Sequence, residues 1–167
     1  QAPHCPIRVD IEPSEMSQIR SANQYDQIPF PIFTEWENPE ALKTLDDDRA
    51  KLSLSGYKRS TVLKGSTLGF TIPKGATIEG IELQFEGHTV GDGIIDDVIV
   101  QLTDGFGNPI GENKANAYRP TTNGWASTSD STDVKWRYGG SDDNWGTNLS
   151  ENQTNTIQFG YQLQIRN

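Results

Sequence analysis

The feature that most constrains the fold is an alternation of apolar and polar residues near the C-terminus. Ile157, Phe159, Tyr161, Leu163 and Ile165 occupy every second position of this segment. Successive side chains of a β-strand point to opposite faces, so the pattern predicts a strand with one buried face. It places Ile157 inward and Gln158 outward.

Other segments carry weaker versions of the same signal. Strands are predicted over 77–89, 94–103 and 134–138, with shorter or interrupted ones over 49–55, over 60–72 and from Ile110. Gly80 indicates a β-bulge, because Ile78 is out of phase with Ile81. Residues 73–75, Pro-Lys-Gly, indicate a turn with proline at its second position, and residues 38–40, Asn-Pro-Glu, indicate a short helical turn.

Strong helix formers are scarce, and no segment predicts a long helix. Six to eight short strands separated by turn residues are typical of a β-sandwich. We therefore predict an all-β fold, an antiparallel and jelly-roll-like β-sandwich. Parallel βαβ architecture is excluded, because the sequence offers no crossover helices.

Residues 1–34 differ from the remainder and predict an extended N-terminal arm, with the sandwich domain over 35–167. Five of the nine prolines lie here, yet the segment is too apolar for a solvated tail. Residues 28–33 read Ile-Pro-Phe-Pro-Ile-Phe. Pro29 and Pro31 remove N–H donors from one edge only, so this segment could pair as an edge strand, either on its own domain or on a neighbouring subunit. We predict assembly contacts between subunits at Ile28, Phe30, Ile32 and Phe33.

Charge and cysteine content exclude several classes of partner and site. The formal net charge is −9, which argues against a nucleic-acid partner and against an anionic membrane surface. Hydrophobic residues make up only 33% of the chain, which favours a loop-rich extracellular or virion-type domain over a typical enzyme. Cys5 is the only cysteine, so neither an intrachain disulfide nor a Cys-based zinc site is expected.

Residues for catalysis or metal binding are few. The two histidines are His4 in the N-terminal segment and His88 at a strand end. His4 beside Cys5 does not supply an oriented base, because neighbouring side chains of an extended chain diverge, so we predict no nucleophilic catalysis and no catalytic residue. Acidic clusters occur at residues 46–48, at Asp92, Asp96 and Asp97, and at residues 142–143. None has an EF-hand spacing, so solvated turn aspartates are the simpler interpretation. No cofactor is predicted; calcium at one of these loops is the alternative.

Tryptophans offer a second kind of candidate site, a platform on which sugar rings stack. Trp136 falls within a predicted strand and is expected in the core. Trp145 lies in a glycine-rich loop and is expected to anchor it. Trp36 and Trp125 are therefore the candidates for contact with a glycan ligand.

An ordered set of motifs resembles a known module. It comprises Trp36 to Pro39, Asp47-Asp48 with Ala50, residues 69–78 (GFTIPKGATI), Gly80-Ile81, residues 113–115 (NKA), residues 138–142 (YGGSD), Trp145-Gly146 and Phe159-Gly160. Over residues 35–165 the chain resembles a β-sandwich module of tailed-bacteriophage virion proteins and some bacterial surface proteins. The resemblance implies no catalytic residues, and residues 1–34 lie outside it.

Together these observations predict a non-enzymatic structural protein of a phage particle, a head decoration or tail-associated protein on the virion surface. Its expected partners are copies of itself or other virion proteins, with a host surface glycan as a further option. Two alternatives stay open. One is a secreted carbohydrate-binding or adhesin module, and the other is a subunit of an extracellular filament joined by donated strands.

Overall fold

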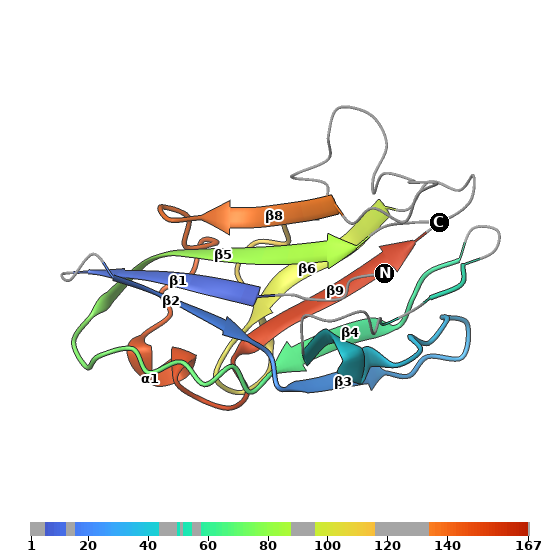
Figure 1. Cartoon of the computed structure of the whole chain (residues 1–167), viewed down its shortest axis with the longest axis horizontal. Coiled ribbons are helices and arrows are strands. Elements are labelled where there is room, and N and C mark those ends of the chain that lie inside the picture. The colour runs from blue at the N-terminus through green and yellow to red at the C-terminus, as the bar shows by residue number, and fades with distance from the viewer. Residues whose placement is uncertain are drawn as a thin grey trace.

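The computed structural model describes residues 6–12, 16–43, 50, 52–54, 58–87, 96–115 and 134–166 of the 167-residue chain. Within these ranges the protein is almost entirely β (Figure 1). The strands are β1 (Pro6–Glu12), β2 (Met16–Ser21), β3 (Gln24–Ile28), β4 (Val62–Ser66), β5 (Thr77–Gly87), β6 (Asp96–Thr103), β7 (Pro109–Ile110), β8 (Val134–Gly140) and β9 (Gly160–Arg166). Two short helices complete the set, the 3-10 helix η1 (Pro39–Lys43) and α1 (Glu151–Thr154).

The strands form two sheets in which every pair is antiparallel. The four-stranded sheet has the order β2-β1-β5-β8, and the five-stranded sheet has the order β3-β4-β9-β6-β7. The prediction of an all-β, antiparallel fold is confirmed.

Side chains from both sheets meet in one hydrophobic core. Phe85 of β5 lies edge-on to Tyr161 of β9, with ring centroids 5.7 Å apart. The Tyr138 hydroxyl of β8 donates to Asp97 Oδ2 of β6 at 2.9 Å. Both contacts cross from one sheet to the other, and all four side chains are buried. Aromatic rings of this size supply much of the buried apolar area.

The C-terminal alternation is confirmed only in part. Tyr161, Leu163 and Ile165 of β9 are buried in the core, as predicted. However, the strand begins at Gly160, and Ile157 lies before it with 68% of its surface exposed. The prediction that Ile157 points inward is wrong. At the first residue of β9, a Cβ on Gly160 would lie 1.8 Å from the Gly65 carbonyl oxygen, so only glycine fits there.

The N-terminal segment differs most from expectation. β1 pairs with β2 on one side and with β5 on the other, and β3 pairs with β4. Ile7 and Val9 are fully buried, and Tyr25 is 4% exposed. In its described part, residues 6–12 and 16–34, the segment thus pairs into both sheets instead of extending away as an arm. Its alternating apolar residues gain more by completing the core than by remaining in water.

Several local predictions can be compared with the structure. The register between β1 and β5 shifts opposite Gly80, which confirms the bulge. The hydrogen bond from Ala76 N to Pro73 O makes Pro73 the first residue of its turn instead of the second, and Gly75 has the expected positive φ of 83°. The short helix predicted at residues 38–40 is η1. The strand predicted over 60–72 is limited to β4, and residues 52–54 form no strand.

Candidate functional site

An exposed apolar turn follows β3 at the edge of the five-stranded sheet. We define it as residues 28–33, the "apolar turn". Ile28, Phe30 and Ile32 expose 46%, 51% and 72% of their surfaces, and Phe33 is half-buried. Apolar side chains scattered singly on a surface are normal, whereas several adjacent ones mark a contact site. The residues predicted from sequence for assembly are therefore brought together on the surface.

The apolar turn is a turn and not the predicted continuous strand. β3 ends at Ile28, which pairs with Val62, and Pro29 follows without an N–H to continue the ladder. Phe33 N then donates to Phe30 O at 3.0 Å, and the rings of Phe30 and Phe33 lie 4.8 Å apart. The segment is thus held in a defined shape that presents Phe30 and Ile32 outward.

Backbone pairing fixes the far end of the apolar turn. Thr34 N donates to Arg59 O at 2.9 Å, and Thr61 N donates to Thr34 O at 2.8 Å. Beyond it, the side chain of Gln27 holds the backbone of Trp36 twice, with Nε2 donating to its carbonyl at 2.9 Å and Oε1 accepting from its N–H at 2.6 Å. The apolar turn is therefore closed at both ends by bonds to the five-stranded sheet.

Trp36 does not form a sugar-stacking platform. Its side chain is 3% exposed and belongs to the core, which corrects the prediction that it contacts a ligand. Its indole Nε1 finds no hydrogen-bond partner among the described residues. The two bonds from Gln27 hold the Trp36 backbone beside β3, and nothing in the local sequence indicates them.

Several other predicted positions lie outside the described residues: Trp125, His4, Cys5, His88, Asp92 and residues 46–48. Trp136 lies in β8, where the structure describes its backbone but not its side chain. Trp145 is confirmed as a buried loop anchor, because it is 0% exposed and its Nε1 donates to Ile81 O at 2.8 Å.

A cluster of charges surrounds Trp145. Lys114 Nζ lies 2.7 Å from Asp143 Oδ2, 3.5 Å from Glu112 Oε2 and 5.3 Å from the centroid of the Trp145 ring. Asp143 Oδ1 also accepts from the Trp145 backbone N–H at 2.8 Å. Trp145 has a φ of 61°, which is costly for a bulky residue. The cluster holds this strained backbone in place, and we interpret it as structural.

The pKa values in this cluster follow from the same contacts. Burial by itself would lower the pKa of Lys114, but the hydrogen bond and charge of Asp143, followed by Glu112, outweigh it and raise that pKa above its ordinary value. Burial would raise the pKa of Asp143, but hydrogen bonds from Lys114 and from the Trp145 N–H lower it. Both shifts stabilise the charged forms, so the pair is an ion pair at neutral pH.

The acidic clusters that the structure describes do not converge. Asp97 is buried against Tyr138, and Asp143 pairs with Lys114. Among the described residues, no group of three or more His, Cys, Asp or Glu side chains is arranged to hold a metal ion. Nor does either described helix combine the length and apolar character needed to span a membrane.

Sequence reasoning missed two exposed apolar residues outside the N-terminal segment. Phe106, in the turn between β6 and β7, is 81% exposed, and Ile157 is 68% exposed. A glycine on each side of Phe106 is a signal for a tight turn that could have identified it as exposed. Neither residue has a second strongly exposed apolar neighbour in sequence, unlike those of the apolar turn.

Comparison of the chain with protein-family models, with curated proteins and with solved structures gives no match.

Proposed function

We propose that the protein is a non-enzymatic structural subunit that joins neighbouring subunits through the apolar turn. The observation that carries this proposal is the exposure of Ile28, Phe30 and Ile32 within one ordered turn. Ordered apolar side chains lose little conformational freedom on contact, so more of their burial energy is available for association.

The free energy available from burying the apolar turn is too small for a complete interface. Burying the exposed parts of these three side chains contributes about 1 kcal/mol each. Two turns in contact would contribute about 6 kcal/mol, while a micromolar complex needs about 8 kcal/mol net after the costs of association. Further contacts around the turn must therefore take part.

The proposed setting is the surface of a phage particle, as a head decoration or tail-associated protein. It rests on the resemblance of the loop motifs over residues 35–165. The expected partners are copies of the chain or other virion proteins. A filament subunit is the closest alternative, because β3 is the edge strand of its sheet and edge strands accept added strands.

A jelly-roll-like sandwich is the proposed arrangement of the two sheets. Its support is that the chain passes repeatedly between sheets, at β2–β3, β4–β5, β5–β6, β7–β8 and β8–β9. The buried aromatic contacts between β5 and β9 also suit two sheets packed face to face. The β1–β2 hairpin within one sheet would be an addition to that pattern.

The test of the proposed function is sedimentation velocity over a range of protein concentrations, together with binding to particles assembled without the protein. The variant is Phe30→Ser combined with Ile32→Ser. The matched control is Phe106→Ser combined with Ile157→Ser, which removes the same two residue types at exposed positions elsewhere, 81% and 68% exposed.

We expect the first variant to weaken self-association or particle binding by about tenfold or more, since it removes at least 1.4 kcal/mol. The control should behave like the unmodified protein. Equal behaviour of the two variants would contradict the proposal, and so would an unmodified protein that neither self-associates nor binds particles.

A further inference from the structure

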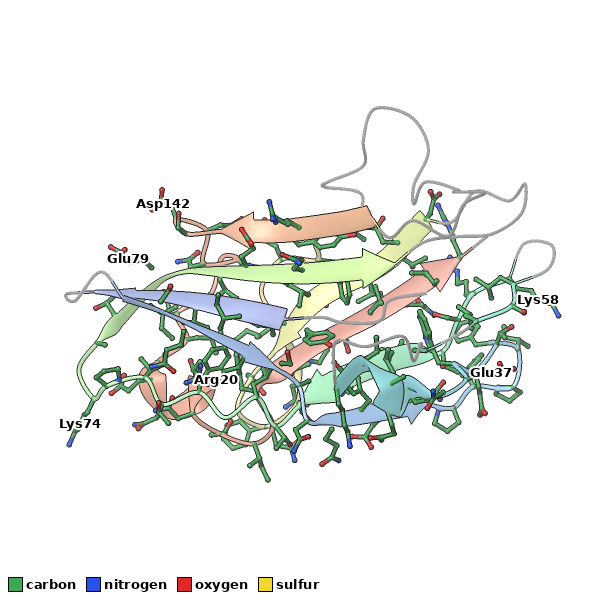
Figure 2. All side chains as sticks on the ribbon, viewed as in Figure 1. Arg20, Glu37, Lys58, Lys74, Glu79 and Asp142 are labelled. Atoms are coloured by element: carbon green, nitrogen blue, oxygen red, sulfur yellow. The ribbon has the colours of Figure 1, made fainter. Side chains whose placement is uncertain are left out.

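A pocket of about 360 Å³ opens between the start of β5 and the loop that leads into α1. Its polar lining comes from Thr77, Asn144, Thr147, Asn148, Ser150 and Glu151. Its volume is within the range of small-ligand sites. Figure 2 shows Lys74, on the turn before β5, at one end of the molecule, and Glu37 and Lys58 at the other. The turn before β5, next to the pocket, and Glu37, which follows the apolar turn in the sequence, therefore lie at opposite ends of the molecule.

The two walls of the pocket are tied together by specific bonds. Glu151 Oε1 accepts from the Gly75 backbone N–H at 3.2 Å. The Asn155 side chain accepts from Ile72 N at 2.8 Å and donates to Ile72 O at 3.0 Å. These bonds hold the segment before β5 against α1, so a ligand would meet a preformed site and need not pay for its ordering.

Hydrogen-bonding capacity in the lining is left unused. The side chains of Thr77 and Asn148 make no hydrogen bond to any other described residue, and Asn148 is exposed. Asn144 uses its Oδ1 to accept from Gly146 N, which leaves its amide Nδ2 as a donor. The lining thus offers both donors and acceptors that converge on one space.

The apolar part of the lining is small. Ala76, Ile78 and Leu149 contribute it, and Leu149 is 7% exposed. A purely apolar ligand would cover these three side chains, but it would bury the unused amide and hydroxyl groups without partners. The free-energy cost of leaving those polar groups unpaired would exceed the free energy gained from the small apolar contact.

Charge narrows the ligand further. Among the described residues of the lining, Glu151 is the only charged side chain, and no described Lys, Arg or His accompanies it. A phosphate or carboxylate ligand would therefore be repelled. A single carboxylate is also too few for calcium, which takes six to eight oxygen ligands, commonly several of them carboxylates. None of the described lining residues is aromatic, so they offer no ring to stack against a nucleobase.

We propose that this pocket binds a neutral sugar residue. Sugar hydroxyls both donate and accept, which matches the amides, the hydroxyls and the Glu151 carboxylate. The C–H groups of a sugar ring can rest on Ile78 and Leu149. The proposal does not depend on assembly through the apolar turn, and it places a glycan site away from the tryptophans that sequence alone indicated.

The test is an NMR titration of the ¹⁵N-labelled full chain with D-glucose, D-galactose, D-mannose and N-acetyl-D-glucosamine, each to high millimolar concentration. We expect saturable shifts of backbone amides in residues 76–78 and 144–151 with at least one sugar. Asn148→Ala should weaken that binding by about five- to tenfold, the loss of a hydrogen-bonded side chain.

Asn152→Ala is the matched control, because Asn152 is also exposed and lies on α1 but outside the lining. It should leave the affinity unchanged. The absence of saturable shifts with all four sugars would overturn the proposal. Shifts that persist equally in Asn148→Ala and the control would do the same, because binding would then lie elsewhere. Sedimentation of the same samples shows separately whether assembly through the apolar turn occurs.

Discussion

Replacement of Ile7 by alanine tests whether the N-terminal segment is part of the core. Ile7 lies in β1 between its partners in β2 and β5, opposite Arg20 and Leu83, and it is fully buried. Truncating a buried isoleucine to alanine removes its transfer free energy and leaves a cavity, at a combined cost of about 2–5 kcal/mol. The free energy of unfolding of the Ile7→Ala protein should therefore be lower by that amount.

The matched control is Ile19→Ala in β2. Ile19 belongs to the same hairpin, but 59% of its surface is exposed. Its replacement should change the free energy of unfolding by less than about 0.5 kcal/mol. If the segment were an extended arm, both substitutions would leave folding of the remainder unchanged.

Thermal unfolding followed by circular dichroism separates these outcomes. A loss of about 3 kcal/mol in a chain of this size lowers the melting temperature by roughly 6–12 °C. Ile19→Ala should stay within about 2 °C of the unmodified protein. Melting temperatures for Ile7→Ala and Ile19→Ala that agree with that of the unmodified protein would refute the placement of β1 in the sheet.

Three further outcomes follow from the described contacts. Leu163→Ala should lower the free energy of unfolding by about 2–5 kcal/mol, and Ile157→Ala by less than about 0.5 kcal/mol, because only Leu163 is buried; urea denaturation measures both. Asp143 has a lowered pKa in the folded protein, so its stabilising contribution is present above its unfolded pKa of about 3.9 and is lost as the pH falls through the lower folded value. In the Asp143→Asn protein, the free energy of unfolding should therefore fall less steeply as the pH is lowered below about 4. An unchanged pH dependence would show that the ion pair with Lys114 contributes nothing to stability. Raising the salt concentration should strengthen self-association, because copies with a net charge of −9 repel one another and salt screens that repulsion; weakening by salt in sedimentation would instead indicate paired opposite charges.

Period-two alternation identified β5 and β9, which have neighbours on both sides, but it did not identify β1, which is also an inner strand. β5 and β9 are central in their sheets, so one face of each must be apolar, and the sequence states this directly. The bulge at Gly80 was also predictable. A Cβ at Gly80 would lie 2.2 Å from the Ser141 backbone, so a glycine is required where β5 approaches the chain that leaves β8.

The inversion at Asp97 could not be predicted from alternation. Counting back from Val100 places Asp97 on the outer face. The register between β6 and β9 shifts between Asp97 and Ile99, which turns the Asp97 carboxylate inward to the Tyr138 hydroxyl. A register shift depends on how the partner strand pairs, and the residues of β6 carry no pattern that predicts it.

The candidate site shows the same division between local and tertiary signals. The sequence indicated that Ile28 to Phe33 are apolar and restricted by proline. It did not indicate that Gln27 would bond to the Trp36 backbone or that the Trp36 ring would be buried, because these two positions are nine residues apart. The pocket between the start of β5 and the loop before α1 could not be predicted either. Its walls come from residues 76–78 and 144–151, which lie far apart in the sequence and are brought together only by the fold.

The placement of β1, β2 and β3 also decides how assembly can be tested. If residues 1–27 were an extended arm, deleting them would test whether the arm is needed for assembly. In the folded protein, the deletion would instead remove β1, β2 and nearly all of β3. It would uncover Leu83 on β5 and open the edge of β4, both of which are covered in the folded protein. We expect the truncated chain to lose its cooperative melting transition and to aggregate through the exposed edges. A truncated chain that melted like the full one would show that Ile7, Val9 and Tyr25 contribute nothing to the core. Only point substitutions at Phe30 and Ile32, which are exposed, can therefore separate assembly from folding.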